Sequence, residues 1–190
     1  MIKIALVGNI ASGKSTVEKT LQELNFPVLD TDIVAHELLE NNSKVIDAFK
    51  DYDILTDGKI SREKLGKVVF SDNKLKQKLE SILHPQIKNK IEDFFSTHAR
   101  KSMAFVSIPL LFEAKMENIF DKILFIYTND EIRLQRLMKR NNYTREYALC
   151  RMNAQICQDE KIKKADWVIY NNSTVEDLKQ NVIKLIEQIH

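Results

Sequence analysis

Short apolar runs alternate along the chain with longer segments whose apolar residues recur at helical spacing. The runs predict buried strands at Ile2–Val7, Phe26–Leu29, Met103–Ile108, Ile123–Tyr127 and Trp167–Tyr170. After the first run, Val17, Leu21 and Leu24 recur at i, i+4 and i+7, which predicts an amphipathic helix. Apolar strands separated by helices are typical of a three-layer α/β sandwich with about five parallel strands.

The stretch 61–100 departs from this alternation, because its pattern is almost wholly helical and contains no convincing strand. It is too long for a simple crossover, so we interpret it as a helical insertion beside the sheet. Pro85 is expected to kink or break the helix near His84. A final helix is predicted from 175 onward, with Ser173 and Glu176 as its capping box.

Composition and charge narrow the class of protein. The 190 residues are 44% hydrophobic and carry a net charge of +2, which is ordinary for one globular domain over 1–190. Because the charge is nearly balanced, we expect no nucleic-acid partner. We also expect no membrane partner, because no apolar run approaches the about 20 residues that cross a bilayer. Cys150 and Cys157 are interpreted as small buried residues in a reducing cytoplasm, where we place the protein.

A phosphate-binding loop follows the first predicted strand. Gly8-Asn9-Ile10-Ala11-Ser12-Gly13-Lys14-Ser15 matches G-x-x-x-x-G-K-[ST]. Gly8 permits a sharp turn out of the strand, and Gly13 lets the backbone approach the phosphates. Lys14 is expected to reach the β- and γ-phosphates of ATP, and the Ser15 hydroxyl to ligate Mg²⁺.

The rest of the sequence selects among proteins with such a loop. No glycine has an aspartate three residues before it, so the D-x-x-G switch motif of GTPases is absent. The closest match to the guanine-reading motif N-K-x-D, at 89–92, lacks the final Asp. No apolar run ends in the Asp-Glu pair that motor ATPases usually carry. A kinase acting on a small molecule is the class that remains.

Two carboxylates end the second predicted strand, in Asp30-Thr31-Asp32. A right-handed crossover predicts that this strand lies beside the first, with its end next to the phosphate loop. A carboxylate there can accept the proton of an attacking hydroxyl. Asp30 or Thr31 can equally cap the following helix, with Asp32 favouring the helix dipole, and the two roles are compatible.

An arginine-rich segment lies late in the chain. Arg133, Arg136 and Arg140 recur at i, i+3 and i+7, which places them on one face of a helix that Thr128 and Glu131 are expected to cap. Arginine forks suit the charge of a transferring phosphoryl group, so we predict a short lid at 136–156. The alternative is a solvated basic face.

The order of the motifs resembles that of the dephospho-CoA kinases. GNIASGKST, LDTD, LHP, PLLFE, RLMKR and ADWVIYNN follow one another from Ile4 to about Ile186, and LHP, PLLFE and the last motif are the most specific. The resemblance implies transfer of the γ-phosphate of ATP to the ribose 3′-hydroxyl of dephospho-CoA, the last step of coenzyme A synthesis. It implies that residues 1–60, 101–130 and 165–190 form the nucleotide-binding core and that the insertion 61–100 binds the acceptor, dephospho-CoA.

The resemblance also implies residue roles. The ATP-binding set would be Gly8, Ala11, Ser12, Gly13, Lys14, Ser15, Thr16 and, near the adenine, Asn171. The acceptor-binding set would be Asp32, Arg62, His84, Pro109, Leu110, Glu113 and Arg136. Lys14, Asp32 and Arg140 would be catalytic, with Asp32 as the base for the 3′-hydroxyl. The loop residues 9–11 depart from the commoner Gly-Gly-Ile-Gly style of the family.

Blander interpretations remain beside these. His84 can be a buried histidine at a helix break, 109–113 a helix start, and Trp167 a core residue of the last strand. A kinase for shikimate or a nucleoside monophosphate is an alternative, although Arg62 is the only arginine between 60 and 99. A non-catalytic nucleotide- or RNA-binding protein would leave the carboxylate pair unexplained. We expect a monomer or weak homo-oligomer.

Overall fold

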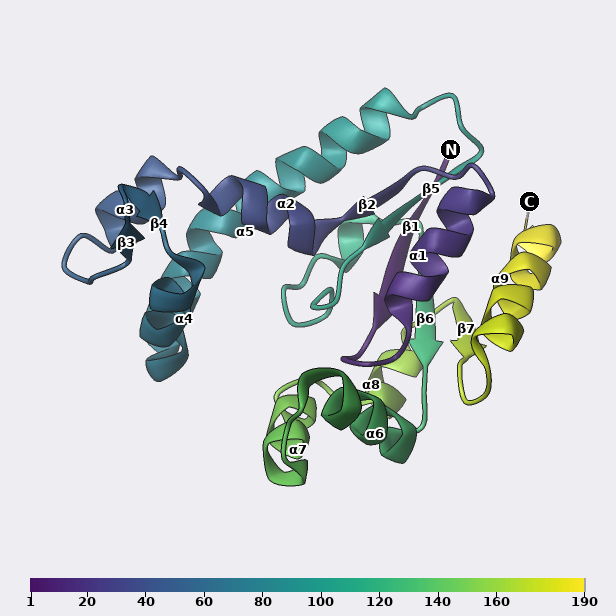
Figure 1. Cartoon of the computed structure of the whole chain (residues 1–190). Coiled ribbons are helices and arrows are strands. Elements are labelled where there is room, and N and C mark those ends of the chain that lie inside the picture. The colour runs from purple at the N-terminus through teal and green to yellow at the C-terminus, as the bar shows by residue number, and fades with distance from the viewer. Residues whose placement is uncertain (190) are drawn as a thin grey trace. The chain divides into compact units, whose positions relative to one another are not determined.

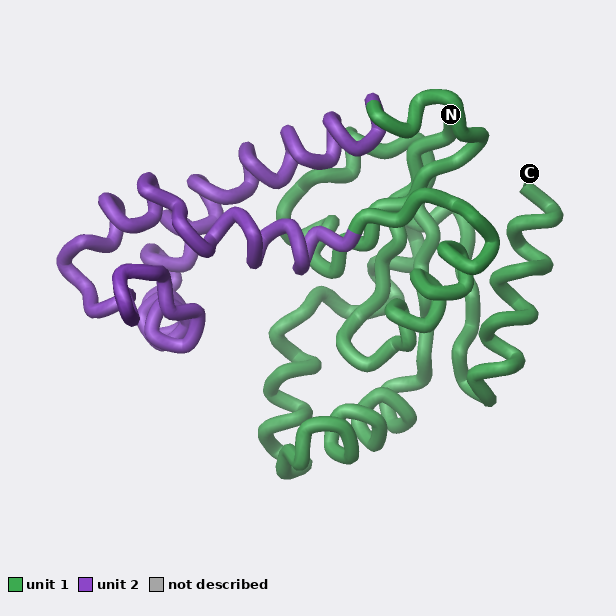
Figure 2. The backbone as a smooth tube through the Cα atoms, turned by 45° about the horizontal axis from the view of Figure 1, so that its top comes forward, with its two compact units in different colours: residues 1–29, 97–190 green, residues 30–96 purple. Residues whose placement is uncertain are grey.

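The computed structural model describes residues 1–189 (Figure 1). They fall into two compact units, shown in Figure 2: a sheet unit of residues 1–29 and 97 onward, and a helical unit of residues 30–96. The sheet unit contains β1 (Ile2–Gly8), α1 (Lys14–Glu23), β5 (Met103–Ser107), η1 (Glu117–Ile119), β6 (Lys122–Tyr127), α6 (Asp130–Asn141), α7 (Arg145–Asn153), α8 (Gln158–Ile162), β7 (Trp167–Tyr170) and α9 (Val175–Ile189), and β2 (Val28–Asp30) ends at its boundary. No helix within the described residues combines the length and apolarity that a bilayer span requires.

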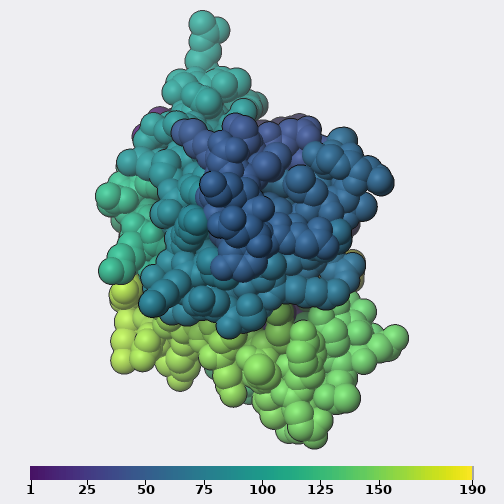
Figure 3. Space-filling model, turned by 90° about the vertical axis from the view of Figure 1, so that its left-hand side faces the viewer, coloured from purple at the N-terminus to yellow at the C-terminus, as the bar shows by residue number. Residues whose placement is uncertain are grey.

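The helical unit holds the predicted insertion together with the segment that precedes it. Its elements are α2 (Thr31–Leu39), α3 (Ser43–Ala48), the short hairpin β3 (Leu55–Thr56) and β4 (Lys59–Ile60), α4 (Arg62–Ser71) and α5 (Asn73–Thr97). Side-chain caps begin three of its helices: Asp30 for α2, Asn42 for α3 and Ser61 for α4. Figure 3 shows one face of this unit as a continuous surface coloured from blue to teal.

The sheet has the strand order β2-β5-β1-β6-β7. Strand β1 pairs in parallel with β5, where Ile2 lies opposite Met103, and with β6, where Ile4 lies opposite Lys122. All five predicted strands form, and β7 has the predicted bounds. The expectation that the second strand lies beside the first is wrong, because β5 lies between β1 and β2. Just before β2, the Phe105 N–H of β5 donates to the Pro27 carbonyl at 2.9 Å.

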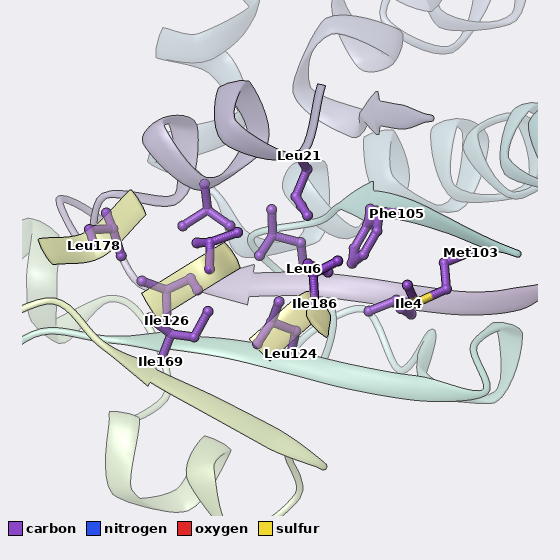
Figure 4. Close-up of a cluster of buried hydrophobic side chains, with 12 residues drawn as sticks. Ile4, Leu6, Leu21, Met103, Phe105, Leu124, Ile126, Ile169, Leu178 and Ile186 are labelled. Atoms are coloured by element: carbon purple, nitrogen blue, oxygen red, sulfur yellow. The ribbon is translucent and has the colours of Figure 1, made fainter. Parts of the chain in front are cut away.

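Alternate residues of β1 build two cores, one on each face of the sheet. Ile4 and Leu6 pack against Leu21 of α1 and Leu178 of α9, and Figure 4 shows this cluster. Ala5 and Val7 pack on the opposite face with the segment after β5 and with Ile162 of α8. Figure 1 shows α1 and α9 side by side on their face of the sheet. These faces form the three layers expected from the apolar strands.

The helix does not break near His84, one of the two outcomes expected at Pro85, and the alternative of a helix start at 109–113 is wrong. Helix α5 continues through Pro85 from Asn73 to Thr97, with Leu83 and Ile87 buried on either side of it. Burial of this stripe outweighs the loss of one backbone hydrogen bond. The segment 109–113 forms turns and no helix.

The caps of two helices differ by one position from those expected. Asn129 caps α6 by accepting from the Glu131 N–H at 3.0 Å, while the Thr128 hydroxyl bonds elsewhere. Thr174 and Asp177 form the box that begins α9 in place of Ser173 and Glu176. Side-chain oxygens at neighbouring positions compete for the same N–H groups, and sequence alone does not decide between them.

The two cysteines are free and exposed, contrary to the expectation that they are buried. Cys150 lies on α7 and Cys157 just precedes α8, so a change of chain direction separates them. Their spacing of seven therefore does not place them on one helix face. Trp167 is half-buried and packs against the core of the sheet unit, as the blander interpretation of it expected.

Candidate active site

The phosphate loop joins the end of β1 to the start of α1, and its backbone requires two glycines. A Cβ atom at Gly8 would lie 2.4 Å from the Ser12 Oγ. Gly13 caps α1 with a φ of 93°, and a Cβ there would lie 2.2 Å from the Asn171 Nδ2. Glycine at both positions thus avoids a clash with a neighbouring side chain, a reason different from those expected, and the close approach of the loop to phosphates stays a prediction.

Two buried side chains hold the loop from behind. The Ser12 carbonyl accepts hydrogen bonds from the Asn171 Nδ2 at 2.8 Å and from the Thr128 hydroxyl at 2.9 Å. Asn171 directly follows β7, and Thr128 directly follows β6. The amide nitrogen of Asn171 is thus engaged by the loop, and its predicted contact with adenine stays a prediction.

Lys14 lies in a small polar cluster at the start of α1. Its Nζ is 2.7 Å from the Glu18 Oε1 and also bonds to the hydroxyl of Ser107 at the end of β5, which donates in turn to Glu18. The side chains of Lys14 and Glu18 are only 14% and 13% exposed. Sequence reasoning missed Glu18 and Ser107; the only signal was a glutamate four residues after the motif lysine.

The residues around the loop fit a bound Mg²⁺ ion. No group of three or more His, Cys, Asp and Glu side chains within residues 1–189 is arranged to hold a metal by itself. Mg²⁺ keeps several waters and takes few protein ligands when substrate phosphates complete its shell. Ser15 is exposed beside Lys14 at the start of α1, where its hydroxyl can be such a ligand.

The predicted lid, 136–156, takes in the second half of α6 and all of α7. Leu134, Leu137, Ala148 and Met152 form the core of the α6–α7 pair, against which Ile10 and Ala11 of the phosphate loop pack. Arg140 is exposed and its Nε donates to the Asn141 side chain at 2.9 Å, while Arg136 is half-buried. Both arginines are thus at least partly accessible to solvent, and their role in a lid stays a prediction.

Arg133 differs from these arginines, since it is 3% exposed. Its Nε donates to the Ile10 carbonyl at 3.0 Å and its Nη1 pairs with Asp130 at 2.7 Å. Burial lowers the pKa of the Arg133 guanidinium, and the Asp130 carboxylate opposes that shift. All three arginines lie in α6, as their spacing predicted, but Arg133 differs from Arg136 and Arg140 in being buried and bonded to the phosphate loop.

The turn segment after β5 contains three of the predicted acceptor residues. Pro109 is half-buried and Leu110 is 42% exposed. Glu113 accepts from the Ile156 N–H at 3.2 Å and lies 2.8 Å from the buried Lys161 Nζ, while its Oε2 is buried with no hydrogen-bond partner. Glu113 thus connects this segment to the residues after α7.

Three more of the seven predicted acceptor residues belong to the helical unit, and the seventh, Arg136, lies on α6. Asp32 is exposed in the first turn of α2, where its N–H donates to the Asp30 side chain at 2.9 Å. Arg62 begins α4 and lines a cavity of about 280 Å³ with His36 and Ile60. His84 is half-buried within the uninterrupted α5, so the helix break imagined around it is absent.

Comparisons with known proteins agree on one family. The family model "Dephospho-CoA kinase" matches residues 2–177. A curated dephospho-CoA kinase of Listeria monocytogenes is 41% identical over 97% of this chain and 96% of its own length. One of Oceanobacillus iheyensis is 39% identical over the same shares.

Solved structures extend the similarity to the fold. A protein from Thermus thermophilus is 33% identical with a TM-score of 0.85, and the alignment covers 100% of this chain and 98% of that one. A dephospho-CoA kinase from Campylobacter jejuni is 34% identical with a TM-score of 0.75, over 98% and 96% of the two chains. A shikimate kinase from Acinetobacter baumannii, at 21% identity over 99% and 94% and a TM-score of 0.59, shares the fold alone.

Proposed function

The chain belongs to the dephospho-CoA kinase family, and from that premise we propose which of its residues perform the phosphorylation. The enzyme phosphorylates dephospho-CoA with ATP, in the last step of coenzyme A biosynthesis. The observation that best supports the residue roles is the phosphate loop, with Lys14 held at the start of α1 between Glu18 and Ser107.

The donor side is formed by the loop and by α1. Gly8 shapes the loop, and the backbone at Ala11, Ser12 and Gly13 surrounds the phosphates of ATP. Lys14 neutralises the β- and γ-phosphates, while Ser15 and Thr16 follow it on the first turn of α1. Mg²⁺, held by the Ser15 hydroxyl, supplies further neutralisation of phosphate charge when bound. Asn171 fixes the loop through Ser12 and faces the adenine.

The acceptor side is assigned to the helical unit and to the segment after β5. Asp32 orients the 3′-hydroxyl of dephospho-CoA and accepts its proton during in-line attack on the γ-phosphorus. Arg62 and His84 bind the acceptor within the proposed acceptor region 61–100. Pro109, Leu110 and Glu113, together with Arg136 of α6, complete the acceptor-binding set.

The lid supplies charge to the transferring group. Arg140, exposed at the end of α6, stabilises the negative charge that develops on the equatorial oxygens, and Arg136 assists it. Most of the acceleration then comes from positioning and electrostatics, because phosphoryl transfer requires little covalent chemistry from the protein.

The setting of the enzyme follows from its surface chemistry. Both cysteines are free thiols, which is typical of a reducing compartment, and we place the enzyme in the cytoplasm. The near-balanced charge of +2 supports small molecules and no nucleic acid as partners. We assign a monomer or weak homo-oligomer, which analytical ultracentrifugation across a range of protein concentrations tests directly.

The test of the reaction is coupled ADP release with ATP and Mg²⁺ over a panel of acceptors. The panel contains dephospho-CoA, shikimate, several nucleoside monophosphates and a blank without acceptor. Turnover restricted to dephospho-CoA, with coenzyme A as product, is the expected result. Turnover restricted to another acceptor would overturn the acceptor assignment, and a Lys14→Ala variant with normal turnover would overturn the role of the loop lysine.

A further inference from the structure

Both backbone polar groups of Ile10, in the phosphate loop, bind side chains from the α6–α7 region: Arg133, just before the predicted lid, and Gln155, within it. The Ile10 N–H donates to the Gln155 Oε1 at 2.8 Å, and the Ile10 carbonyl accepts from the Arg133 Nε at 3.0 Å. Arg133 lies in the first turn of α6, and Gln155 follows the end of α7. The beginning and the end of the α6–α7 pair therefore meet at one residue of the loop.

A parallel connection exists at the preceding residue. The Asn9 Nδ2 donates to the Ile156 carbonyl at 3.0 Å, and the Ile156 N–H donates to Glu113 at 3.2 Å. Gln155 and Ile156 thus connect Asn9 and Ile10 of the loop to the segment that follows β5. The side chain of Asn9 is 4% exposed, so these bonds form largely out of contact with solvent.

The residue after Ile10 has an unusual backbone conformation. Ala11 has a φ of 62°, in the left-handed region that residues with a Cβ atom rarely adopt. Asparagine can offset this conformation through local hydrogen bonds, and glycine adopts it freely, but the methyl group of alanine does neither. Neighbouring contacts must therefore maintain it: those of Ser12 on one side, with Asn171, Thr128 and Asn9, and those of Ile10 on the other.

We infer that Gln155 and Arg133 are positioning residues for ATP: by fixing Ile10, they hold Ala11 in the left-handed conformation that directs the loop toward the phosphates. The inference rests on the proposed binding of ATP by this loop. The same hydrogen bonds determine which N–H groups of the loop are left to bind phosphate. Ile10 donates to Gln155 and Ser12 donates to Asn9 at 3.0 Å, whereas Ala11 and Gly13 donate to no backbone carbonyl within the described chain.

The test is a double-mutant cycle on binding of an ATP analogue. Calorimetry measures the Kd of the Mg²⁺ complex of a non-hydrolysable ATP analogue for the wild type, Gln155→Leu, Ala11→Gly and the double variant, without dephospho-CoA. Gln155→Leu removes the acceptor of the Ile10 N–H and is expected to raise the Kd about tenfold. In the Ala11→Gly background the same change is expected to raise it about threefold or less, because glycine needs no support at positive φ.

Three further variants separate positioning from loss of structure. Gln135→Leu removes an exposed glutamine of α6 whose side chain contacts Glu131 at 3.5 Å, and is expected to leave the Kd unchanged. Gln155→Glu keeps an acceptor oxygen and is expected to bind within about twofold of the wild type. Should the leucine variant fail to fold, Gln155→Asn takes its place in the cycle, since it shortens the side chain and withdraws the amide from Ile10.

The outcomes distinguish this inference from the proposed function. An unchanged Kd for Gln155→Leu, or an equal increase in both backgrounds, would overturn the positioning role. In steady state the change is expected in the KM for ATP and not in the KM for dephospho-CoA. If the wild type phosphorylated a different acceptor, the proposed function would fail while the binding cycle would still decide the role of Gln155.

Discussion

The Lys14 Nζ lies 2.7 Å from the Glu18 Oε1, one helical turn apart on α1, and both side chains are largely shielded from solvent. A lysine side chain has four rotatable bonds and is oriented only by its partners. Glu18 and the Ser107 hydroxyl supply that orientation before any nucleotide arrives. The ammonium is thereby held at the start of α1, where the phosphates are proposed to bind.

We expect Glu18→Gln to lower kcat/KM for ATP by about tenfold, because the ammonium loses its charged partner and its fixed orientation. Steady-state kinetics with varied ATP measures the effect. The matched control is Glu92→Gln, which removes an exposed i,i+4 pair with Lys88 at 3.8 Å and is expected to change nothing. A Glu18→Gln enzyme as active as the control would contradict this role.

Substitution of Asp30 is expected to affect stability, and substitution of Asp32 is expected to affect catalysis. Asp32→Asn removes the proposed base and is expected to lower kcat by a factor of about 10² to 10⁴ with little change in stability. Asp30 caps α2 by accepting from the Asp32 N–H, so Asp30→Ala is expected to lower the free energy of unfolding by about 1 kcal/mol. Single-turnover kinetics and urea denaturation read the two effects, and an Asp32→Asn enzyme with full kcat would refute the assignment of the base.

Gly13 and Gly66 are expected to respond oppositely to alanine. At Gly13 a methyl group would displace the Asn171 amide and impose a strained φ, so Gly13→Ala is expected to cost roughly 2 kcal/mol or more and to abolish ATP binding. Gly66 lies within α4, and its added Cβ would meet only ordinary contacts at 3.7 Å or beyond. Gly66→Ala is expected to stabilise the fold by about 1 kcal/mol, measured by denaturant unfolding. Equal effects at the two sites would contradict the steric account of the loop.

The stability of the sheet unit is expected to depend on the ionisation of Asp166, which accepts from the Ile123 N–H at 2.8 Å. Partial burial acts to raise the pKa of this carboxyl, but the hydrogen bonds from Lys122 and Ile123 and the Lys122 charge outweigh it and lower the pKa. A lowered folded-state pKa stabilises the fold above the unfolded value of about 4, and this contribution disappears as the pH falls through the folded value.

Asp166→Asn is therefore expected to be less stable than the wild type by roughly 1 kcal/mol at pH 7, with the difference shrinking below about pH 4. Denaturant unfolding at several pH values measures it. Asp51→Asn, at an exposed position of the helical unit, is the control and is expected to leave the free energy of unfolding at pH 7 unchanged. A difference for Asp166→Asn that stayed constant down to pH 2.5 would contradict the lowered pKa.

The strands and the phosphate loop were predictable because each depends on local pattern. A strand buried on both faces must be apolar along its length, as in 103–106 and 123–126. The glycines of the loop are fixed by atoms of the motif and its immediate surroundings. Strand order was not predictable, since the apolar pattern of β2 is the same whether β1 or β5 lies next to it.

The partners of the site residues were harder to predict for a related reason. Gln155 meets Ile10, and Ser107 meets Lys14, across long stretches of sequence that carry no common motif. The spacing of the arginines indicated a helix face but not the depth of each position, so Arg133 was grouped with its exposed neighbours although it is buried. Such contacts are decided by packing, which a single sequence does not encode position by position.

The register of the central strand has a consequence for the order in which the chain can fold during synthesis. Ile2 pairs with Met103 and Ile4 with Lys122, so β1 has no neighbouring strand until most of the chain has left the ribosome. The helical unit is continuous from 30 to 96, and its internal contacts become available earlier. The nascent phosphate loop must therefore wait, unsupported, for strands that are translated only after the whole helical unit, and during this delay the apolar β1 is an exposed segment that chaperones can protect.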